Sequence, residues 1–176
     1  MSMIRTVFVS VVLGASLTWL GGCTAKIVVT PINLEKTSVE VHIVGLTESE
    51  YHRWAAKSMT DYWKPDDQLR TDAVKCGIVY VMKFVDNKPA YLELKKDDPI
   101  WKTWSDLKVE YIFVLADLPG VADKPGDADP RRIILPAESS HWDMRYWGNQ
   151  LVDIKVSPGG LKCVSKYTRK RPPDPS

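Results

Sequence analysis

The cysteines have the most distinctive chemistry in this chain, because a thiol can be modified, oxidised or used as a nucleophile. Cys23 ends the sequence Leu-Gly-Gly-Cys and follows an almost uncharged run from Thr6 to Leu20, with Arg5 in front. A basic residue, an apolar run and small residues, in that order, are the three parts of a secretory signal peptide. The run is too short to span a bilayer comfortably, since about 20 apolar residues are needed. We therefore predict that residues 1–22 are a signal peptide and that the rest of the chain is exported.

The tetrapeptide Leu20 to Cys23 resembles the lipobox of bacterial lipoproteins, in which the cysteine thiol is lipidated and becomes the new N-terminus. The resemblance implies that Cys23 is a lipid anchor that carries acyl chains such as palmitate. Several acyl chains hold a protein durably on a membrane, because each buried CH2 contributes about 0.8 kcal/mol. Thr24 rather than aspartate follows the cysteine, which in that family implies the outer membrane, with the folded part in the periplasm. An ordinary signal peptide with an incidental cysteine and a retained signal anchor are the alternatives.

Cys76 and Cys163 would remain in an oxidising compartment, where two leftover cysteines favour a disulfide. Both fall on apolar faces of segments with strand-like patterns. Closing so long a loop contributes on the order of 4 kcal/mol in the chain-entropy model. We predict a disulfide between them, and the alternative is two buried free thiols that pack as small hydrophobic groups.

The remaining titratable residues form no catalytic or metal-binding pattern. The histidines are not paired at the spacing of metal ligands, and we expect His42 on the outward face of its strand. Asp123, Asp127 and Asp129 do not match the EF-hand spacing, and prolines interrupt them, so we expect a solvated acidic loop. The sequence has no Gly-x-Ser-x-Gly motif, no P-loop and no dinucleotide-binding fingerprint. We predict a protein that is not an enzyme and has no metal or cofactor.

One aromatic and cationic group lies in a segment with weak secondary-structure signal. It contains Trp142, Arg145, Tyr146 and Trp147. Exposed Trp, Tyr and Arg are the usual anchors of a protein–protein interface. We predict that this group binds a partner together with Asp123 and Asp127 of the long polar loop 118–131. Two alternatives stay open, since the same aromatics could line a glycan-binding platform or pack beneath a loop.

Alternation of apolar and polar residues predicts several short strands. They cover Ile27–Val29, Ser38–Val44, Cys76–Phe84, Ala90–Leu94, Val109–Leu115 and Ile133–Leu135, followed by a hairpin of Leu151–Val156 with Leu161–Ser165. Thr47 and Glu50 have the spacing of a capping box, which predicts a helix with Trp54 as its most buried residue. Asp98-Pro99 predicts a second short helix. Because no β-α-β rhythm appears, we predict a mainly β, two-sheet sandwich with one or two short helical insertions.

The composition is that of a single exported domain. The net charge is +2, and removal of the signal peptide with its one charge, Arg5, leaves +1. A balance so close to neutral gives no reason to expect nucleic-acid binding. We assign residues 23–168 to one lipid-anchored periplasmic domain, which is long enough for one core. Residues 169–176 are rich in proline and basic side chains and are predicted to be a disordered tail.

The lipobox, the strand Ser38–Val44 and the helix that starts at Thr47 resemble the outer-membrane lipoprotein of type VI secretion systems, the TssJ family. The segment Arg131–Pro136, followed by Trp142 and the final hairpin, is similar to that family's C-terminal half. The resemblance implies a transthyretin-like sandwich with added helices, which tethers a membrane complex and binds the periplasmic part of an inner-membrane partner, TssM. The predicted function is a non-enzymatic anchor of a secretion-system or envelope assembly. The alternative is a periplasmic lipoprotein that binds a glycan or another small ligand.

Overall fold

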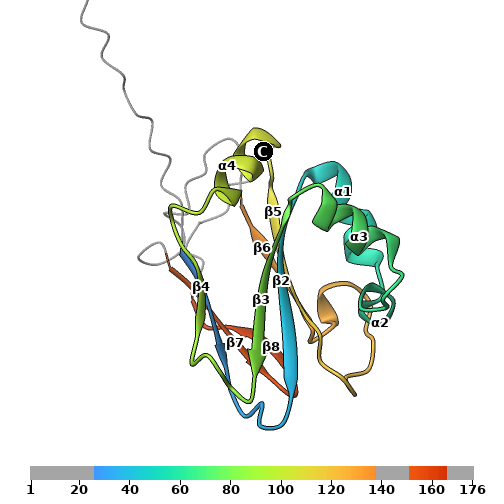
Figure 1. The fold of residues 1–176 in the computed structure, drawn as a ribbon. Helices are drawn as coiled ribbons and strands as arrows, with labels where there is room; N and C mark the ends of the chain where they lie inside the picture. The colour runs from blue at the N-terminus through green and yellow to red at the C-terminus, as the bar shows by residue number, and fades with distance from the viewer. Residues whose placement is uncertain (1–25, 138–150, 166–176) are drawn as a thin grey trace, which may run out of the picture.

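The computed structural model describes residues 26–137 and 151–165, and two four-stranded sheets pack face to face in it (Figure 1). The first sheet contains, in spatial order, β4 (Leu92–Leu94), β1 (Lys26–Pro31), β7 (Leu151–Ser157) and β8 (Gly160–Cys163). The second contains β3 (Val79–Val85), β2 (Ser38–Leu46), β5 (Tyr111–Ala116) and β6 (Arg132–Pro136). The helices are α1 (Glu48–Ala56), α2 (Met59–Tyr62), α3 (Gln68–Lys75) and α4 (Ile100–Asp106), with one 3₁₀ turn, η1 (Gly126–Ala128). The predicted mainly β, two-sheet sandwich is confirmed.

The core lies between the two sheets and follows the alternation of the strands. In β1 and β7 every second residue is fully buried, as expected of strands with one face on a core. In β5 all residues from Ile112 to Ala116 are buried. The continuous apolar sequence of this strand therefore reflects cover on both of its faces, as predicted.

A parallel pair joins the first described strand to a late one. Lys26 of β1 lies opposite Leu151 of β7, and the pairing continues to Pro31 opposite Val156. The other strand pairs within the described residues are antiparallel. Local alternation predicts both strands but carries no information that they are neighbours.

Helix α1 begins as the sequence predicts. The capping box is present, and the backbone N–H of Thr47 donates to the carboxylate of Glu50 at 3.3 Å. Trp54 is the buried residue of this helix and is 1% exposed. Its indole packs against the rings of Tyr62 and Phe113, so α1 is fixed to the outer face of the second sheet.

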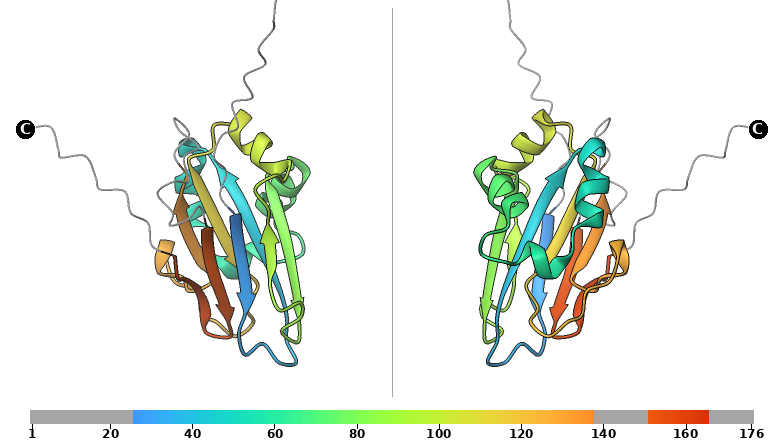
Figure 2. Two further views of the ribbon diagram at one scale, coloured as in Figure 1. Left: turned by 90° about the vertical axis from the view of Figure 1, so that its left-hand side faces the viewer. Right: turned by 90° about the vertical axis from the view of Figure 1, so that its right-hand side faces the viewer.

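The helices form two insertions, as expected, but the insertion between β2 and β3 contains two helices, α2 and α3, that the sequence patterns do not predict. Each has a local cap. The hydroxyl of Ser58 accepts from the N–H of Asp61 at 3.1 Å, and the carboxylate of Asp67 accepts from the N–H of Arg70 at 2.8 Å. Both helices are short, so neither shows the repeated apolar spacing that marks a longer helix. Together with α1 they form a layer outside the second sheet (Figures 1 and 2).

Helix α4 covers one end of the sandwich. The helix is present as predicted but begins one residue later, with Pro99 rather than Asp98 at the N-cap, and the carboxylate of Asp98 accepts from the N–H of Ile100 at 3.0 Å. Trp104 of this helix is fully buried, and its indole N–H donates to the carbonyl of Ile78 at 3.0 Å. The indole lies directly over Gly45 of β2, where a methyl group would meet its ring atoms at 2.5–2.7 Å. Glycine is therefore required at this position for Trp104 to pack.

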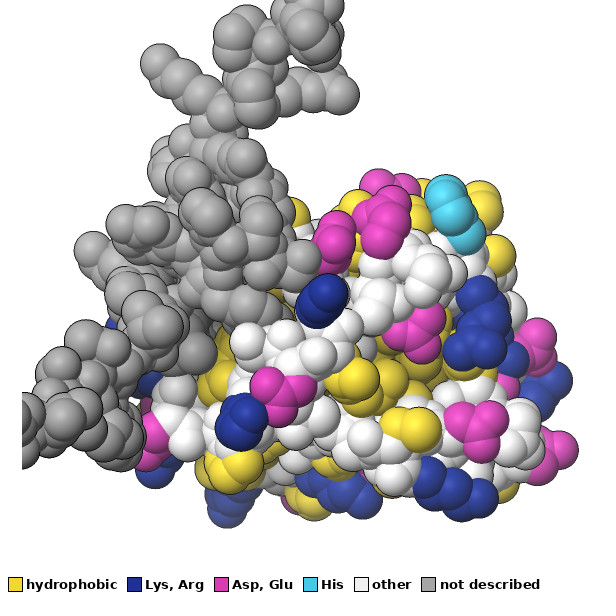
Figure 3. All heavy atoms as spheres, turned by 90° about the horizontal axis from the view of Figure 1, so that it is seen from above, with side chains coloured by type: hydrophobic (Ala, Val, Ile, Leu, Met, Phe, Trp, Pro, Cys, Tyr) yellow, Lys and Arg dark blue, Asp and Glu magenta, His cyan; other side chains and the backbone are white. Residues whose placement is uncertain are grey.

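The end that α4 covers is also where β1 begins, and we call it the β1 end. Ile27 lies opposite Leu94, the last residue of β4, and α4 follows β4 directly. Helix α1 leaves β2 at the same end (Figures 1 and 2). Seen from above, the described side chains of this end mix acidic and basic groups with hydrophobic ones between them (Figure 3).

The predicted disulfide is absent from the structure, in which Cys76 and Cys163 are both free thiols. The assignment of Cys76 to a strand is wrong, since this residue is the exposed C-cap of α3 and β3 begins only at Val79. Cys163 ends β8, an edge strand of the other sheet. It is half-buried, and this burial raises the pKa of its thiol.

Candidate functional site

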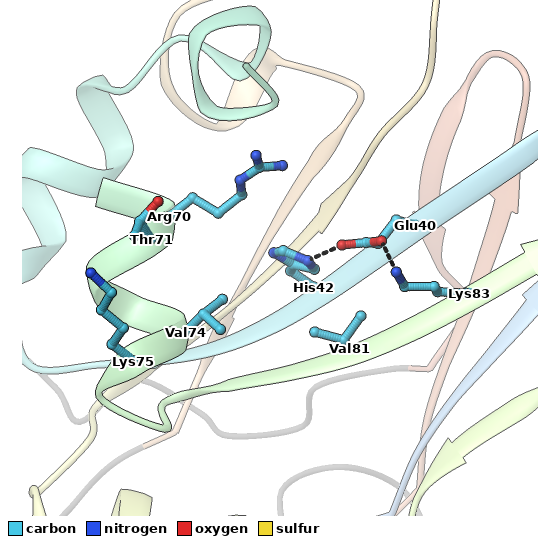
Figure 4. Close-up of a pocket in the computed structure, with 8 residues that line it drawn as sticks. All are labelled: Glu40, His42, Arg70, Thr71, Val74, Lys75, Val81 and Lys83. Carbon is cyan, nitrogen blue, oxygen red and sulfur yellow. Dashed lines mark hydrogen bonds and ion pairs between the residues drawn. The ribbon is translucent and has the colours of Figure 1, made fainter. Parts of the chain in front are cut away.

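A groove of about 470 Å³ lies between α3 and the outer face of β2 and β3 (Figure 4). It is lined by Arg70, Thr71, Val74 and Lys75 from α3, by Glu40 and His42 from β2, and by Val81 and Lys83 from β3. Glu40 lies opposite Lys83 in the strand register, and His42 lies opposite Val81. The alternation of the two strands therefore turns all four side chains to the same face of the sheet. The volume is within the range of roughly 300–1,000 Å³ that ligand sites occupy.

His42 lies on the outer face of β2, as predicted, and there it forms the buried base of the groove. It is 2% exposed, because Tyr62 and Trp63 cover this part of β2, and the Trp63 ring centre lies 4.8 Å from the imidazole. The imidazole Nδ1 is 2.7 Å from the Tyr62 hydroxyl, and Nε2 is 2.7 Å from the Glu40 carboxylate. Lys83 donates to the other oxygen of Glu40 at 2.7 Å. Four side chains thus form one hydrogen-bonded chain.

The protonation states in this chain follow from burial and charge. Burial lowers the pKa of His42, although the hydrogen bond to Glu40 opposes the shift. Burial raises the pKa of Glu40, but hydrogen bonds from Lys83 and His42 outweigh it and hold this pKa below its usual value. Burial also raises the pKa of the Tyr62 hydroxyl far above its usual range. At neutral pH the hydroxyl of Tyr62 therefore donates to Nδ1 of a neutral imidazole, whose Nε2–H donates to the carboxylate.

This arrangement orders the base of the groove rather than presenting a reactive group. A general base or nucleophile must reach a substrate atom. Tyr62 is fully buried and both nitrogens of His42 are engaged within the fold. Fully satisfied buried networks of this kind rigidify the structure around them. The base of the groove is therefore rigid, and a ligand or partner can pack against it.

We expect the stability of the domain to fall on mild acidification because of His42. Since burial lowers its pKa in the folded state, the unfolded chain binds the proton more tightly. The stabilisation is fully present above the unfolded pKa of about 6.5 and is lost as the pH falls from that value through the lower pKa of the folded state. Urea unfolding of the wild type and of His42→Gln between pH 8 and pH 5 measures the effect. The free energy of unfolding should decline more steeply with falling pH in the wild type, and parallel curves would contradict the assignment.

The loop 118–131 is largely exposed, as expected from its sequence, but one of its carboxylates binds it to the rest of the domain. The carboxylate of Asp123 accepts from the Ser58 hydroxyl at 2.6 Å and from the Thr60 N–H at 2.9 Å, and it pairs with Arg131. Desolvation opposes these hydrogen bonds, but they hold the pKa of Asp123 far below its usual value. Asp129 is 1% exposed and forms a second ion pair with Arg131. The cation thus makes the burial of Asp129 tolerable.

Of the predicted partner-binding residues, the structure describes Asp123 and Asp127. Asp127 is exposed in η1, whereas Asp123 is held by contacts within the fold. The other predicted residues lie outside the described residues and stay predictions: Trp142, Arg145, Tyr146 and Trp147, as well as the predicted anchor Cys23. Three tryptophans nearer the N-terminus, Trp54, Trp101 and Trp104, are buried and belong to the core.

Within 26–137 and 151–165, no group of three or more His, Cys, Asp or Glu side chains has an arrangement that could hold a metal ion. In the same ranges, no helix combines the length and the apolar character needed to cross a bilayer.

The fold is that of a two-sheet β-sandwich with peripheral helices, and solved structures of similar fold exist. One is Serratia marcescens Lip, a membrane-bound component of the type VI secretion system, with a TM-score of 0.43, 12% identity, and coverage of 79% of this chain and 95% of that chain. Another is the type VI secretion lipoprotein TssJ1 from Pseudomonas aeruginosa, with a TM-score of 0.45, 14% identity, and coverage of 85% and 99%. No family model and no curated protein matches the sequence. These similarity values are low, so neither structure assigns a function to this chain.

Proposed function

We propose that this chain is a lipid-anchored protein on the periplasmic face of the outer membrane, where it anchors a secretion-system complex through protein–protein contacts. The position of Cys23 carries the proposal, since this residue precedes Lys26, the first residue of β1, by three positions. Three residues span at most about 11 Å. An acylated Cys23 would therefore hold the β1 end of the sandwich close to the membrane surface.

The partner that the sequence resemblance implies is the periplasmic domain of an inner-membrane component similar to TssM. Two features support this proposal. The chain forms a two-sheet sandwich with added helices, as the TssJ resemblance implies. The aromatic segment that contains Trp142, Arg145, Tyr146 and Trp147 ends shortly before Leu151, which lies beside Lys26 at the β1 end. Contacts through this segment would place the partner near the membrane, whereas Asp123 and Asp127, as further candidates, lie in the loop that follows β5 away from the β1 end.

Replacement of Cys23 by serine tests the anchor. The variant should no longer incorporate an alkyne analogue of palmitate, and it should move from the membrane fraction to the soluble fraction, because serine lacks the thiol that is acylated. Cys76→Ser is the matched control, since Cys76 is an exposed free thiol, and this variant should keep both the label and the membrane location. Label retained by Cys23→Ser, or lost equally from both variants, would refute Cys23 as the anchor.

Affinity purification of the acylated protein from its native envelope tests the assembly role. Recovery of an inner-membrane secretion component supports an anchor within a membrane complex. Recovery of lipid and this protein alone, at good yield, contradicts that role and favours binding of a glycan or another small ligand.

A further inference from the structure

We propose that the groove between α3 and β3 is a docking site for a segment of a partner protein that carries apolar side chains beside carboxylates. The inference rests on the proposed function, because it gives the chemistry that a partner in the same assembly would present. It concerns a surface that the sequence analysis did not single out. Three features of the groove support it: the exposed valines, which we call the apolar floor; the basic side chains at its edge, which we call the cationic rim; and the hydrogen-bonded His42 at its base.

Three valines give this surface its apolar character. Val74, Val81 and Val85 are 50%, 41% and 56% exposed. Val81 and Val85 flank Lys83 on the outer face of β3, and four strand residues span about 13 Å. Val74 of α3 lies across the groove from Val81 (Figure 4). Exposed apolar side chains gathered on one surface are typical of interaction sites.

The rim of the groove is cationic. Arg70, Lys75 and Lys83 line it, against the single carboxylate of Glu40. Lys83 neutralises that carboxylate in an ion pair at 2.7 Å. Lys75 is exposed in the last turn of α3. The groove therefore has a positive field, which favours carboxylates on whatever binds there.

Arg70 is held in place before any partner arrives. Its guanidinium donates to the carbonyl of Lys64 at 2.8 Å and lies 5.9 Å from the ring centre of Trp63. Trp63 in turn packs on His42, whose hydrogen bonds fix the base of the groove. A pre-ordered cation loses little side-chain entropy on binding, which favours a specific contact over a diffuse one.

The combination of charge and apolar area selects among occupants. The chain's own C-terminal tail is a poor match, because Lys166, Arg169, Lys170 and Arg171 would meet like charges in the groove. A small inorganic anion would leave Val74, Val81 and Val85 uncovered. A protein segment in which Asp or Glu alternates with Val, Leu or Ile matches both the rim and the floor. We therefore assign the groove to such a segment.

Site-specific photo-crosslinking of the full chain in its native host tests the proposal. The probe is p-benzoylphenylalanine at Val81, and the matched control carries it at Val164, which follows β8 on the other sheet. Both valines are 41% exposed, so the two probes are equally accessible to solvent and differ in which surface of the domain they report on. We expect a cross-link at Val81 and none at Val164. The cross-linked peptide, identified by mass spectrometry, should contain carboxylates next to apolar residues.

Charge reversal sharpens this test. Lys75→Glu should lower the yield of the Val81 cross-link about tenfold, because a like charge then faces the partner's carboxylates. Lys75→Arg should keep the yield. Lys162→Glu, an exposed lysine of β8, should also leave it unchanged. An acidic-to-lysine change in the cross-linked segment of the partner should restore binding to the Lys75→Glu variant.

The outcomes separate the groove from the proposed function. A cross-linked peptide without carboxylates, a cross-link to a second copy of this chain, or no cross-link at all overturns the docking proposal. If the inner-membrane component still co-purifies in those cases, the anchor role stands without the groove. If the acidic segment is found but belongs to a protein outside any secretion complex, the groove is supported and the proposed function fails.

Discussion

Gly45→Ala should lower the free energy of unfolding by about 2–3 kcal/mol, because the new methyl group has no space beneath the Trp104 indole. A Cβ built at Gly45 lies 2.5 Å from the indole Cδ1 and 2.6 Å from Nε1. The ring cannot move away freely, since Trp104 is fully buried and its N–H is bonded to the carbonyl of Ile78. The same carbonyl also accepts from the N–H of Gly45 at 3.2 Å, so displacement disturbs both bonds. Denaturant titration of the purified domain measures the loss.

Gly159→Ala is the matched control, because a Cβ at Gly159 meets no atom within 4 Å. This variant should unfold at nearly the same denaturant concentration as the wild type. A smaller side chain in the Gly45→Ala background, Trp104→Leu, should relieve the clash, so the double variant should be less destabilised than the two single losses added together. Unchanged stability of Gly45→Ala, or strict additivity in the cycle, would show that the close approach does not constrain the fold.

The second large effect is expected at Asp129, where alanine should cost about 3–5 kcal/mol because it removes the buried partner of Arg131 and leaves this buried cation only the partly exposed Asp123. The carboxylate accepts from Nε and Nη2 of Arg131 at 3.0 and 2.9 Å and from that residue's backbone N–H at 2.9 Å. It also accepts from the N–H of Lys124 at 3.1 Å. Four hydrogen bonds to one carboxylate are lost together, and the loop 118–131 should detach from α2. Thermal unfolding, with proteolysis to detect the released loop, measures both consequences.

Asp127→Ala is the control that separates the effect of removing a buried carboxylate from the effect of removing a negative charge. Asp127 is exposed and lies two positions before Asp129. This substitution should change stability little. Arg131→Met combined with Asp129→Ala should be less destabilised than Asp129→Ala alone, since no unpaired charge then remains buried. Equal losses in the Asp127 and Asp129 variants would rule out the buried ion pair as the cause.

Features of the fold encoded in adjacent residues were predictable, and features that depend on distant pairing were not. The capping box of Thr47 and Glu50 and the alternation of β2 lie within a few positions, so they predicted the strand and the helix after it. Helices α2 and α3 were not predicted because each is short and Pro65 between them interrupts any continuous helical pattern. The resulting error extended to Cys76, which was assigned to a strand although it caps α3.

The candidate site was largely invisible in the sequence for the same reason. Alternation placed His42 on the polar face of β2, and that is its face in the structure, but Tyr62 and Trp63 from a separate helix bury it there. The alternation of Val81, Lys83 and Val85 is the one local pattern that indicates an exposed apolar strip on β3. Such a pattern in a strand is not by itself evidence of a partner-binding surface. Partners of Asp123 such as Ser58 lie 65 positions away, beyond any local rule.

The parallel pair of β1 and β7 constrains the order in which the domain can be assembled. Lys26 and Leu151 are partners although they stand 125 positions apart in the chain, so closing that contact carries a large loop-entropy cost. The other neighbour of β1, β4, is the nearer one, yet it pairs over only three residues, from Leu92 to Leu94. A chain that crosses a membrane N-terminus first would deliver β1 before either neighbour exists on that side. Strand β1, next to the proposed anchor, would thus be the first strand to cross the membrane and among the last to be paired on both sides.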